Sequence, residues 1–109
     1  MVNLSHVSPL SRREADLCFA LADPKRIDIL HALKRHPYNV NELTLELGIP
    51  QPMTSRHLKI LRERGLVQST RHGVSVIYAL SDPRVFQALE LLNDIQRGCV
   101  APDSEIKPI

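Results

Sequence analysis

The chain has 109 residues, a formal net charge of +2 and a hydrophobic content of 43%. This length suits one domain, excludes two, and provides enough apolar side chains for a real core. Two cysteines are too few for a disulfide framework, and no apolar run approaches the roughly 18 residues of a membrane-spanning helix. Because no signal-peptide pattern opens the sequence, we expect a cytoplasmic protein that contacts no membrane.

The positive charge is concentrated in one segment. Residues 50–75 hold five Lys and Arg side chains against Glu63 alone, a local charge of +4, whereas the rest of the chain sums to −2. A basic segment on a slightly acidic body favours a single surface that faces a polyanion. The alternative is a solvated basic helix face with no partner.

The first third of the chain predicts two helices. We expect residues 1–8 to form a flexible N-terminus, and Ser8-Pro9 or Ser11 to begin a helix that runs to about Leu21. Asp23-Pro24 begins the next helix, because Asp accepts free N–H groups at a helix start and Pro has no N–H to lose there. His36-Pro37 ends this second helix.

The middle of the chain predicts two short helices joined by a tight turn. Asn39 or Asn41 starts a third helix, and Gly48 closes it as a C-terminal cap. A fourth helix spans about 51–64, with Pro near its start and Gly65 at its end. Two short helices with a tight Gly-containing connection are typical of a helix-turn-helix.

The last third changes from helical spacing to alternation. Residues 67–71 and 74–80 read as two strands that flank His72-Gly73, which predicts a β-hairpin with Gly at its tip. Ser81-Asp82-Pro83 then begins a fifth helix that ends near Gly98. We expect one domain over 9–98, followed by an irregular tail over 99–109.

Several segments carry a family resemblance in the right order. They are FALADPKRIDIL at 19–30, Asn41-Glu42-Leu43, the segment 48–67, and VIYAL at 76–80. Together they resemble the ArsR/SmtB family of bacterial repressors over about residues 10–97. The resemblance implies a winged helix-turn-helix: mainly α with a small β-hairpin, ordered as four helices, two strands and a fifth helix.

The same resemblance implies a homodimer in which the first and last helices pack across a two-fold axis. Both segments have broad apolar faces, as a shared interface needs. The expected interface residues are Leu10, Leu17, Leu21, Phe86, Leu89, Leu92 and Ile95. The alternative is a monomer whose terminal helices close their own core.

The fourth helix has the side chains of a DNA-reading helix. We expect it to lie in the major groove, with Gln51 able to pair with adenine and Arg56 with guanine. Lys59 and Arg62 suit phosphates, and the hairpin tip suits a minor groove. The full predicted set of DNA-contacting residues is Gln51, Thr54, Ser55, Arg56, His57, Lys59, Arg62, Arg71 and His72. For His57, local packing is an equally good interpretation.

Two details of this helix qualify the prediction. We expect its buried face to hold Met53, Leu58 and Leu61. The family usually has Ser just before the Gln as a helix cap, and here that residue is Pro50. The helix start can therefore shift by one residue, which would change the base contact of Gln51.

The sequence argues against the metal sites that the resemblance would suggest. The thiolate site of the third helix needs a Cys-x-Cys motif, and residues 39–42 read NVNE. The zinc site of the last helix needs a histidine among residues 82–97, which have none. We therefore predict no metal and no cofactor, and the sequence identifies no inducer.

A redox response remains as an alternative hypothesis. One branch of the family senses sulfide or oxidants with a Cys late in the second helix and another near the end of the last. Cys99 lies close to the second position, but His31 occupies the first. Cys18 lies in the first helix, where a small buried thiol is the ordinary explanation. A Cys18–Cys99 or Cys99–Cys99 switch is one possibility, and regulation through abundance or a partner protein, without any small molecule, is another.

The sequence favours a homodimeric repressor that binds an inverted repeat in double-stranded DNA. The competing class is a winged helix used only for protein–protein contact, which the local +4 charge argues against. An enzyme is the weakest hypothesis, because no nucleophile–base pair, glycine-rich phosphate loop or carboxylate pair is recognisable.

Overall fold

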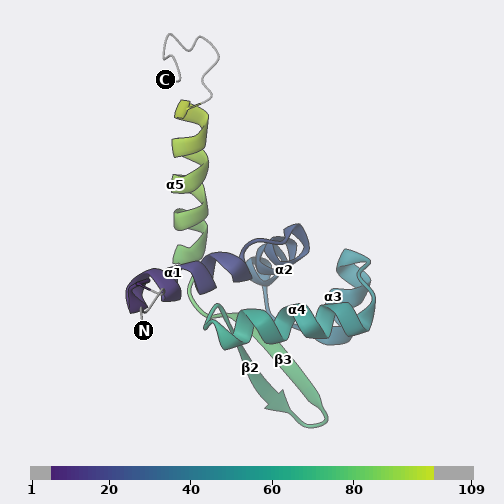
Figure 1. Cartoon of the computed structure of the whole chain (residues 1–109). Coiled ribbons are helices and arrows are strands. Elements are labelled where there is room, and N and C mark those ends of the chain that lie inside the picture. Colours follow the sequence, from purple (N-terminus) through teal and green to yellow (C-terminus); the bar gives the residue numbers. More distant parts are fainter. Residues whose placement is uncertain (1–5, 100–109) are drawn as a thin grey trace.

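The computed structural model describes residues 6–99, and side chains as far as residue 98. Five helices and a small sheet follow one another in the expected order (Figure 1). They are α1 (Pro9–Ala20), α2 (Pro24–Arg35), β1 (Tyr38–Asn39), α3 (Val40–Leu47), α4 (Gln51–Glu63), β2 (Val67–His72), β3 (Ser75–Leu80) and α5 (Arg84–Cys99). In the part of the chain that the structure describes, no helix is long and apolar enough to cross a membrane.

The helix ends follow from local side-chain chemistry. Ser8 caps α1 by accepting from the Ser11 backbone N–H at 2.9 Å, and Asp23 caps α2 by accepting from the Lys25 N–H at 2.8 Å. Gly48 ends α3 with φ of +66°, a left-handed conformation that suits glycine. Each of these ends was predicted.

The helix-turn-helix consists of α3 and α4, and the wing is the β2–β3 hairpin. The turn of the hairpin is Gly73-Val74, one residue later than predicted, because His72 still pairs with Ser75 in the ladder. Strand β1, which was not predicted, adds a third strand by pairing Tyr38 with Tyr78, so the sheet order is β1-β3-β2. The winged-helix prediction is thus confirmed, with one additional strand.

The core lies between α2, α3, α4 and the start of the sheet. It contains the fully buried side chains of Ile29, Leu30, Leu43, Leu58 and Leu61, together with Ala20, Ala32, Leu33, Tyr38 and Val67. Leucine, valine and isoleucine at i, i+3 and i+4 spacing bring one face of each helix into this core. The core therefore fixes α4 against the body and leaves its other face in solvent.

Helix α5 is arranged differently. It stands away from the body, with α1 crossing near its base (Figure 1). Its first turns pack on the core through Val85 and Phe86. Every described side chain from 90 to 98 is exposed.

Candidate nucleic-acid interface

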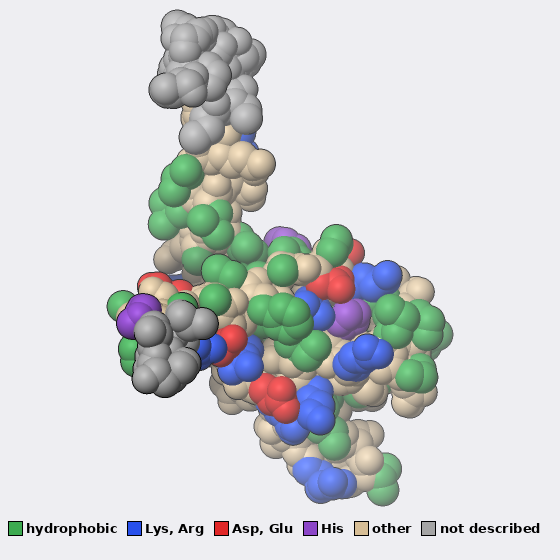
Figure 2. Space-filling view, viewed as in Figure 1, with side chains coloured by type: hydrophobic (Ala, Val, Ile, Leu, Met, Phe, Trp, Pro, Cys, Tyr) green, Lys and Arg blue, Asp and Glu red, His purple; other side chains and the backbone are tan. Residues whose placement is uncertain are grey.

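The exposed side of α4 gathers the polar residues that the sequence singled out. Gln51, Ser55, Lys59 and Arg62 follow at spacings of four, four and three residues, which is one stripe of an α-helix, and Arg56 lies beside it. All five are exposed, whereas Leu58 and Leu61 on the opposite side are fully buried. Figure 2 shows Lys and Arg side chains over this part of the body and at the hairpin tip.

The wing continues this surface. Arg71 and His72 are both exposed at the end of β2, opposite Val76 and Ser75. Arg62 links the two parts, since its Nη1 donates to the Ser69 hydroxyl of β2 at 3.5 Å. We call Gln51, Ser55, Arg56, Lys59, Arg62, Arg71 and His72 the basic surface.

Thr54 does not belong to this surface, so its predicted DNA contact is not supported. Its side chain is fully buried. The hydroxyl lies 3.2 Å from the Pro50 carbonyl and 3.4 Å from that of Ile49, and it accepts from the Thr44 hydroxyl at 3.3 Å. Thr54 thus satisfies polar groups of the turn between α3 and α4, a common role for a threonine four residues after a carbonyl.

His57 is the second predicted contact that the structure places in the interior. Its side chain is 6% exposed, and Arg26 Nη1 lies 3.1 Å from its Nδ1. Burial lowers the pKa of the imidazole below 6.5, and the positive charges of Arg26, Lys25 and Arg56 lower it further, while Asp23 opposes them. Of the two interpretations of His57, local packing and hydrogen bonding is therefore the one that agrees with the structure.

Met53 takes the opposite position from the one expected. It is 38% exposed on the outer side of the first turn of α4, where a core position was predicted. The reason is that Thr54, not Met53, is in the stripe of residues 54, 57, 58 and 61 that faces the body. Helix α4 begins at Gln51, with Pro50 in the cap position and no side-chain cap.

The start of α4 has few free backbone N–H groups that a negatively charged ligand could bind. Met53 and Thr54 donate their backbone N–H groups to the Pro50 carbonyl. Pro52, at the second helical position, has no N–H to donate. The N-terminus of α4 therefore offers fewer free backbone N–H donors than most helix starts do.

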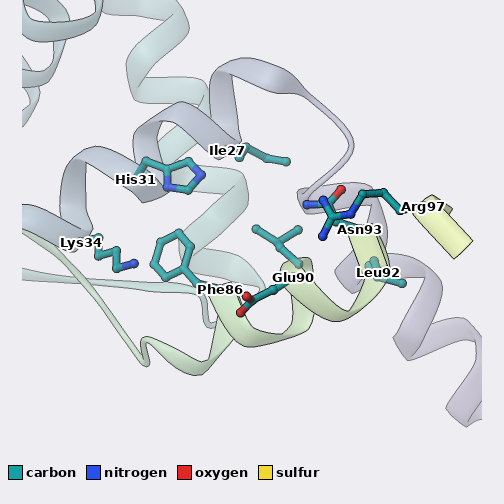
Figure 3. Close-up of a pocket in the computed structure, with 9 residues that line it drawn as sticks. Ile27, His31, Lys34, Phe86, Glu90, Leu92, Asn93 and Arg97 are labelled. Atoms are coloured by element: carbon teal, nitrogen blue, oxygen red, sulfur yellow. The ribbon is translucent and has the colours of Figure 1, made fainter. Parts of the chain in front are cut away.

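A cleft of about 510 Å³ lies between α2 and α5, away from the basic surface. Figure 3 shows His31 and Lys34 of α2 beside Phe86 of α5. The two ring centroids of His31 and Phe86 are 5.0 Å apart, and the Lys34 ammonium lies 4.8 Å from the Phe86 centroid. These stacking contacts join the base of α5 to the body.

The described residues offer little for a metal. Among residues 6–98, no three His, Cys, Asp or Glu side chains come together in a way that could hold an ion. Cys18 is exposed, contrary to the buried thiol expected, and lines an apolar hollow between α1 and α5. Cys99 ends α5, and its side chain lies outside the described residues.

The predicted dimer residues divide into two groups. Leu10, Leu17, Leu92 and Ile95 are between 36% and 64% exposed. Leu21, Phe86 and Leu89 are half-buried, and the first two of them pack on the core of their own chain. The exposed group, with Leu91 at 63%, forms apolar faces on α1 and α5 that none of residues 6–98 covers.

Comparison with known proteins also points to a family of bacterial regulators. Residues 23–69 match the profile of the family described as "Bacterial regulatory protein, arsR family". The SmtB transcriptional repressor of Mycobacterium tuberculosis is 45% identical over 67 residues, which cover 62% of this chain and 50% of that protein. The chain thus spans half the length of this relative.

Two further relatives are matched over most of their length. The transcriptional activator HlyU of Vibrio cholerae is 34% identical over 92 residues, which are 84% of this chain and 85% of HlyU. The crystal structure of NolR from Sinorhizobium fredii superposes with a TM-score of 0.72 at 30% identity, covering 84% of this chain and 96% of NolR. With these matches and the winged helix in place, the chain belongs to the arsR family of bacterial regulatory proteins.

Proposed function

We propose that this protein is a sequence-specific DNA-binding transcriptional repressor that acts as a homodimer. The observation that carries the proposal is the basic surface, in which exposed α4 side chains and the wing tip lie on one connected face. Side chains of this kind donate to base edges and phosphates. Relatives named as repressors, SmtB and the PagR protein of Bacillus anthracis, agree with this assignment.

The proposed recognition divides between two kinds of contact. Gln51 and Arg56, in the first half of α4, reach base edges in the major groove, while Lys59 and Arg62 bind phosphates further along. Arg71 and His72 enter the neighbouring minor groove, where a narrow width favours cations. Ser55 serves either a base or a phosphate.

The uncovered faces of α1 and α5 support a second copy of this chain as the partner. Leu10, Leu17, Leu92 and Ile95 would meet their counterparts across a two-fold axis. The apolar hollow of about 450 Å³ between α1 and α5 adds a recess for such side chains. Two recognition helices related in this way fit half-sites one helical turn apart, about 34 Å. One solved winged helix-turn-helix relative, from Mycobacterium bovis, is described as homodimeric.

The test is fluorescence anisotropy of the full chain against a labelled duplex from upstream of its own gene, beside a scrambled duplex, at low and moderate salt. Tight binding that prefers the native duplex and weakens as salt rises is expected, because phosphate contacts release counterions. Absence of binding, or equal binding to both duplexes in all conditions, would contradict the proposal and favour a protein partner.

Two substitutions test the division of labour. Arg56→Ala should relax base preference by about 1–3 kcal/mol, whereas Lys59→Ala should weaken all duplexes alike and reduce the salt slope by about one. Arg97→Ala is the matched control, because it removes one positive charge at the far end of α5, where Arg97 is paired with Asp94. Uniform losses of the same size in Arg56→Ala and Lys59→Ala would refute the division.

A further inference from the structure

Arg26 is a buried charged residue on the core side of α2. Its side chain is 6% exposed and lies on the helical stripe of Ile29, Leu30 and Leu33. Its Nε donates to the Ala20 carbonyl at 2.8 Å, and its Nη2 donates to the Phe19 carbonyl at 2.9 Å. Both carbonyls are in the last turn of α1, where regular helical N–H partners run out, although the Phe19 carbonyl also accepts from the Ala22 N–H at 3.0 Å. Arg26 therefore holds the end of α1.

The same guanidinium also holds the recognition helix. Its Nη1 donates to Nδ1 of His57 in α4 at 3.1 Å, and lies 3.9 Å from the Asp23 carboxylate. Because a guanidinium has only donors, Nδ1 must accept, and the imidazole must be neutral with its proton on Nε2. Nε2 is buried and has no hydrogen-bond partner among the described residues. We call Asp23, Arg26, His57 and the two α1 carbonyls the Arg26 cluster.

The Arg26 cluster connects the helix proposed for dimerisation with the helix proposed for DNA binding. Helix α1 belongs to the proposed dimer interface, and α4 carries the basic surface. The second link between these helices is the ion pair of Arg64 with Asp16, which spans 3.8 Å and is largely exposed, so it holds them weakly. Three hydrogen bonds from one buried, planar group define the relative position of α1, α2 and α4 more sharply than an exposed pair does.

We propose that Arg26 is a positioning residue for DNA recognition, which fixes α4 on the end of α1 through a neutral His57, so that protonation of His57 releases the recognition helix and weakens DNA binding. This inference rests on the proposed function and adds a regulatory input to it.

The charges around His57 set the direction of the effect. Arg26 and Lys25 face it from α2, and Arg56 from α4 itself, against the single carboxylate of Asp23 at the start of α2. Helix α1 contributes backbone carbonyls that Arg26 already occupies. A protonated imidazole would present an N–H to the guanidinium where a lone pair is needed. Acid therefore breaks the Arg26–His57 hydrogen bond and adds a repulsion.

The experiment measures the affinity of the full chain for its upstream duplex between pH 8 and pH 5.5 at constant salt. Wild-type affinity should fall several-fold across this range but by less than about tenfold, because tenfold is the most that an imidazole of ordinary pKa loses one pH unit below that pKa, and the pKa of His57 is lowered by burial. His57→Gln should lack this fall, because the amide oxygen can accept from Arg26 and does not titrate. The ratio of the two profiles removes every pH-dependent contribution that both proteins share.

Four further measurements complete the test. His36→Gln, at an exposed histidine outside the cluster, should keep the wild-type pH profile. Arg26→Lys should bind more weakly at every pH, since one ammonium cannot reach both carbonyls and His57 together. Thermal melts of each variant by circular dichroism establish that the compared proteins are folded. The Nε2-protonated tautomer of His57 should appear in nitrogen chemical shifts of the free protein.

The outcomes are distinct. Identical pH profiles for wild type and His57→Gln would overturn the inference and leave His57 as a packing residue. Affinity that rises in acid, and a rise that His57→Gln removes, would also overturn it and indicate a direct phosphate contact by a cationic His57. No wild-type binding at any pH would overturn the proposed function together with the inference.

Discussion

The body of the molecule and helix α5 have similar apolar spacing but opposite burial. In the body, Leu30, Leu43 and Leu58 lie at 0% exposure in a core closed within the chain. On α5, Leu91, Leu92 and Ile95 are between 58% and 64% exposed. Helical periodicity predicts that an apolar face packs against another surface, but it does not identify that surface. The body finds its cover in the same chain, and we propose that α5 finds it in a second copy.

The largest expected effect is in the body. Leu58→Ala should lower the free energy of unfolding by about 2–5 kcal/mol, because it removes a fully buried side chain and leaves a cavity. Chemical denaturation at fixed protein concentration measures this loss. Leu45→Ala is the matched control, since Leu45 is 84% exposed on α3 and should change the free energy of unfolding little. Equal effects of the two changes would mean that the core is wrongly placed.

The second prediction tests the other side of the comparison. Ile95→Asp places a charge on the uncovered face of α5 and should weaken self-association by at least about 30-fold, the factor for a hot spot of about 2 kcal/mol. Sedimentation equilibrium measures it. Asn93→Asp adds the same charge on another side of α5, by the cleft with α2, and should leave self-association unchanged. A wild-type chain that is monomeric at all concentrations would refute the proposed interface.

Local signals account for the parts of the fold that the sequence predicted well. Asp23-Pro24, Gly48 and Gly65 each act within a few residues, so the helix boundaries they define could be read directly. Strand β1 could not, because two residues have no periodicity and form a strand only by pairing with β3. The nearest local signal is Pro37, which restricts His36, two residues before β1, to an extended conformation.

The candidate site was predicted less completely, for a physical reason. Thr54 and His57 have polar side chains, and their burial depends on partners elsewhere in the fold, namely the turn carbonyls for Thr54 and Arg26 for His57. A signal existed in the spacing, since 54, 57, 58 and 61 form one stripe of α4. Residues 26, 29, 30 and 33 of α2 form another. His57 on the α4 stripe and Arg26 on the α2 stripe are polar residues at buried positions, and this pattern indicates a buried hydrogen bond between them.

A smaller effect is expected at the start of α3. Asn39 accepts from the Glu42 N–H at 2.8 Å, and Glu42 accepts from the Asn39 N–H at 2.8 Å, which makes a capping box. Asn39→Ala should lower the free energy of unfolding by about 1 kcal/mol. Asn41→Ala, in the exposed first turn of the same helix, is the control for the loss of an asparagine. No difference between the two would show that water replaces the cap at no cost.

The smallest effect compares the helix starts of the two regions. Asp23 begins α2 in the body and Asp82 precedes α5, and both carboxyls have a pKa lowered below 3.8. For Asp23 the main cause is the Lys25 backbone N–H, and for Asp82 it is the Arg84 side chain. A lowered folded-state pKa means that the stabilisation is complete above about pH 4 and is lost as the pH falls below it. Acid titrations of unfolding should therefore show a smaller loss of stability below pH 4 in Asp23→Asn and in Asp82→Asn than in wild type.

The two variants should differ in their response to salt. The Asp82 carboxylate is held mainly by an exposed ion pair with Arg84, at 2.8 Å, which added salt screens. Asp23 is held by a backbone N–H of its own helix, and a hydrogen bond at a helix start is less sensitive to screening. The acid effect that Asp82→Asn removes should thus shrink at high salt, while the one that Asp23→Asn removes should persist. If the acid effect removed by Asp23→Asn shrank at high salt and the one removed by Asp82→Asn persisted, the assignment of the ion pair to Asp82 and the backbone hydrogen bond to Asp23 as main causes would be wrong.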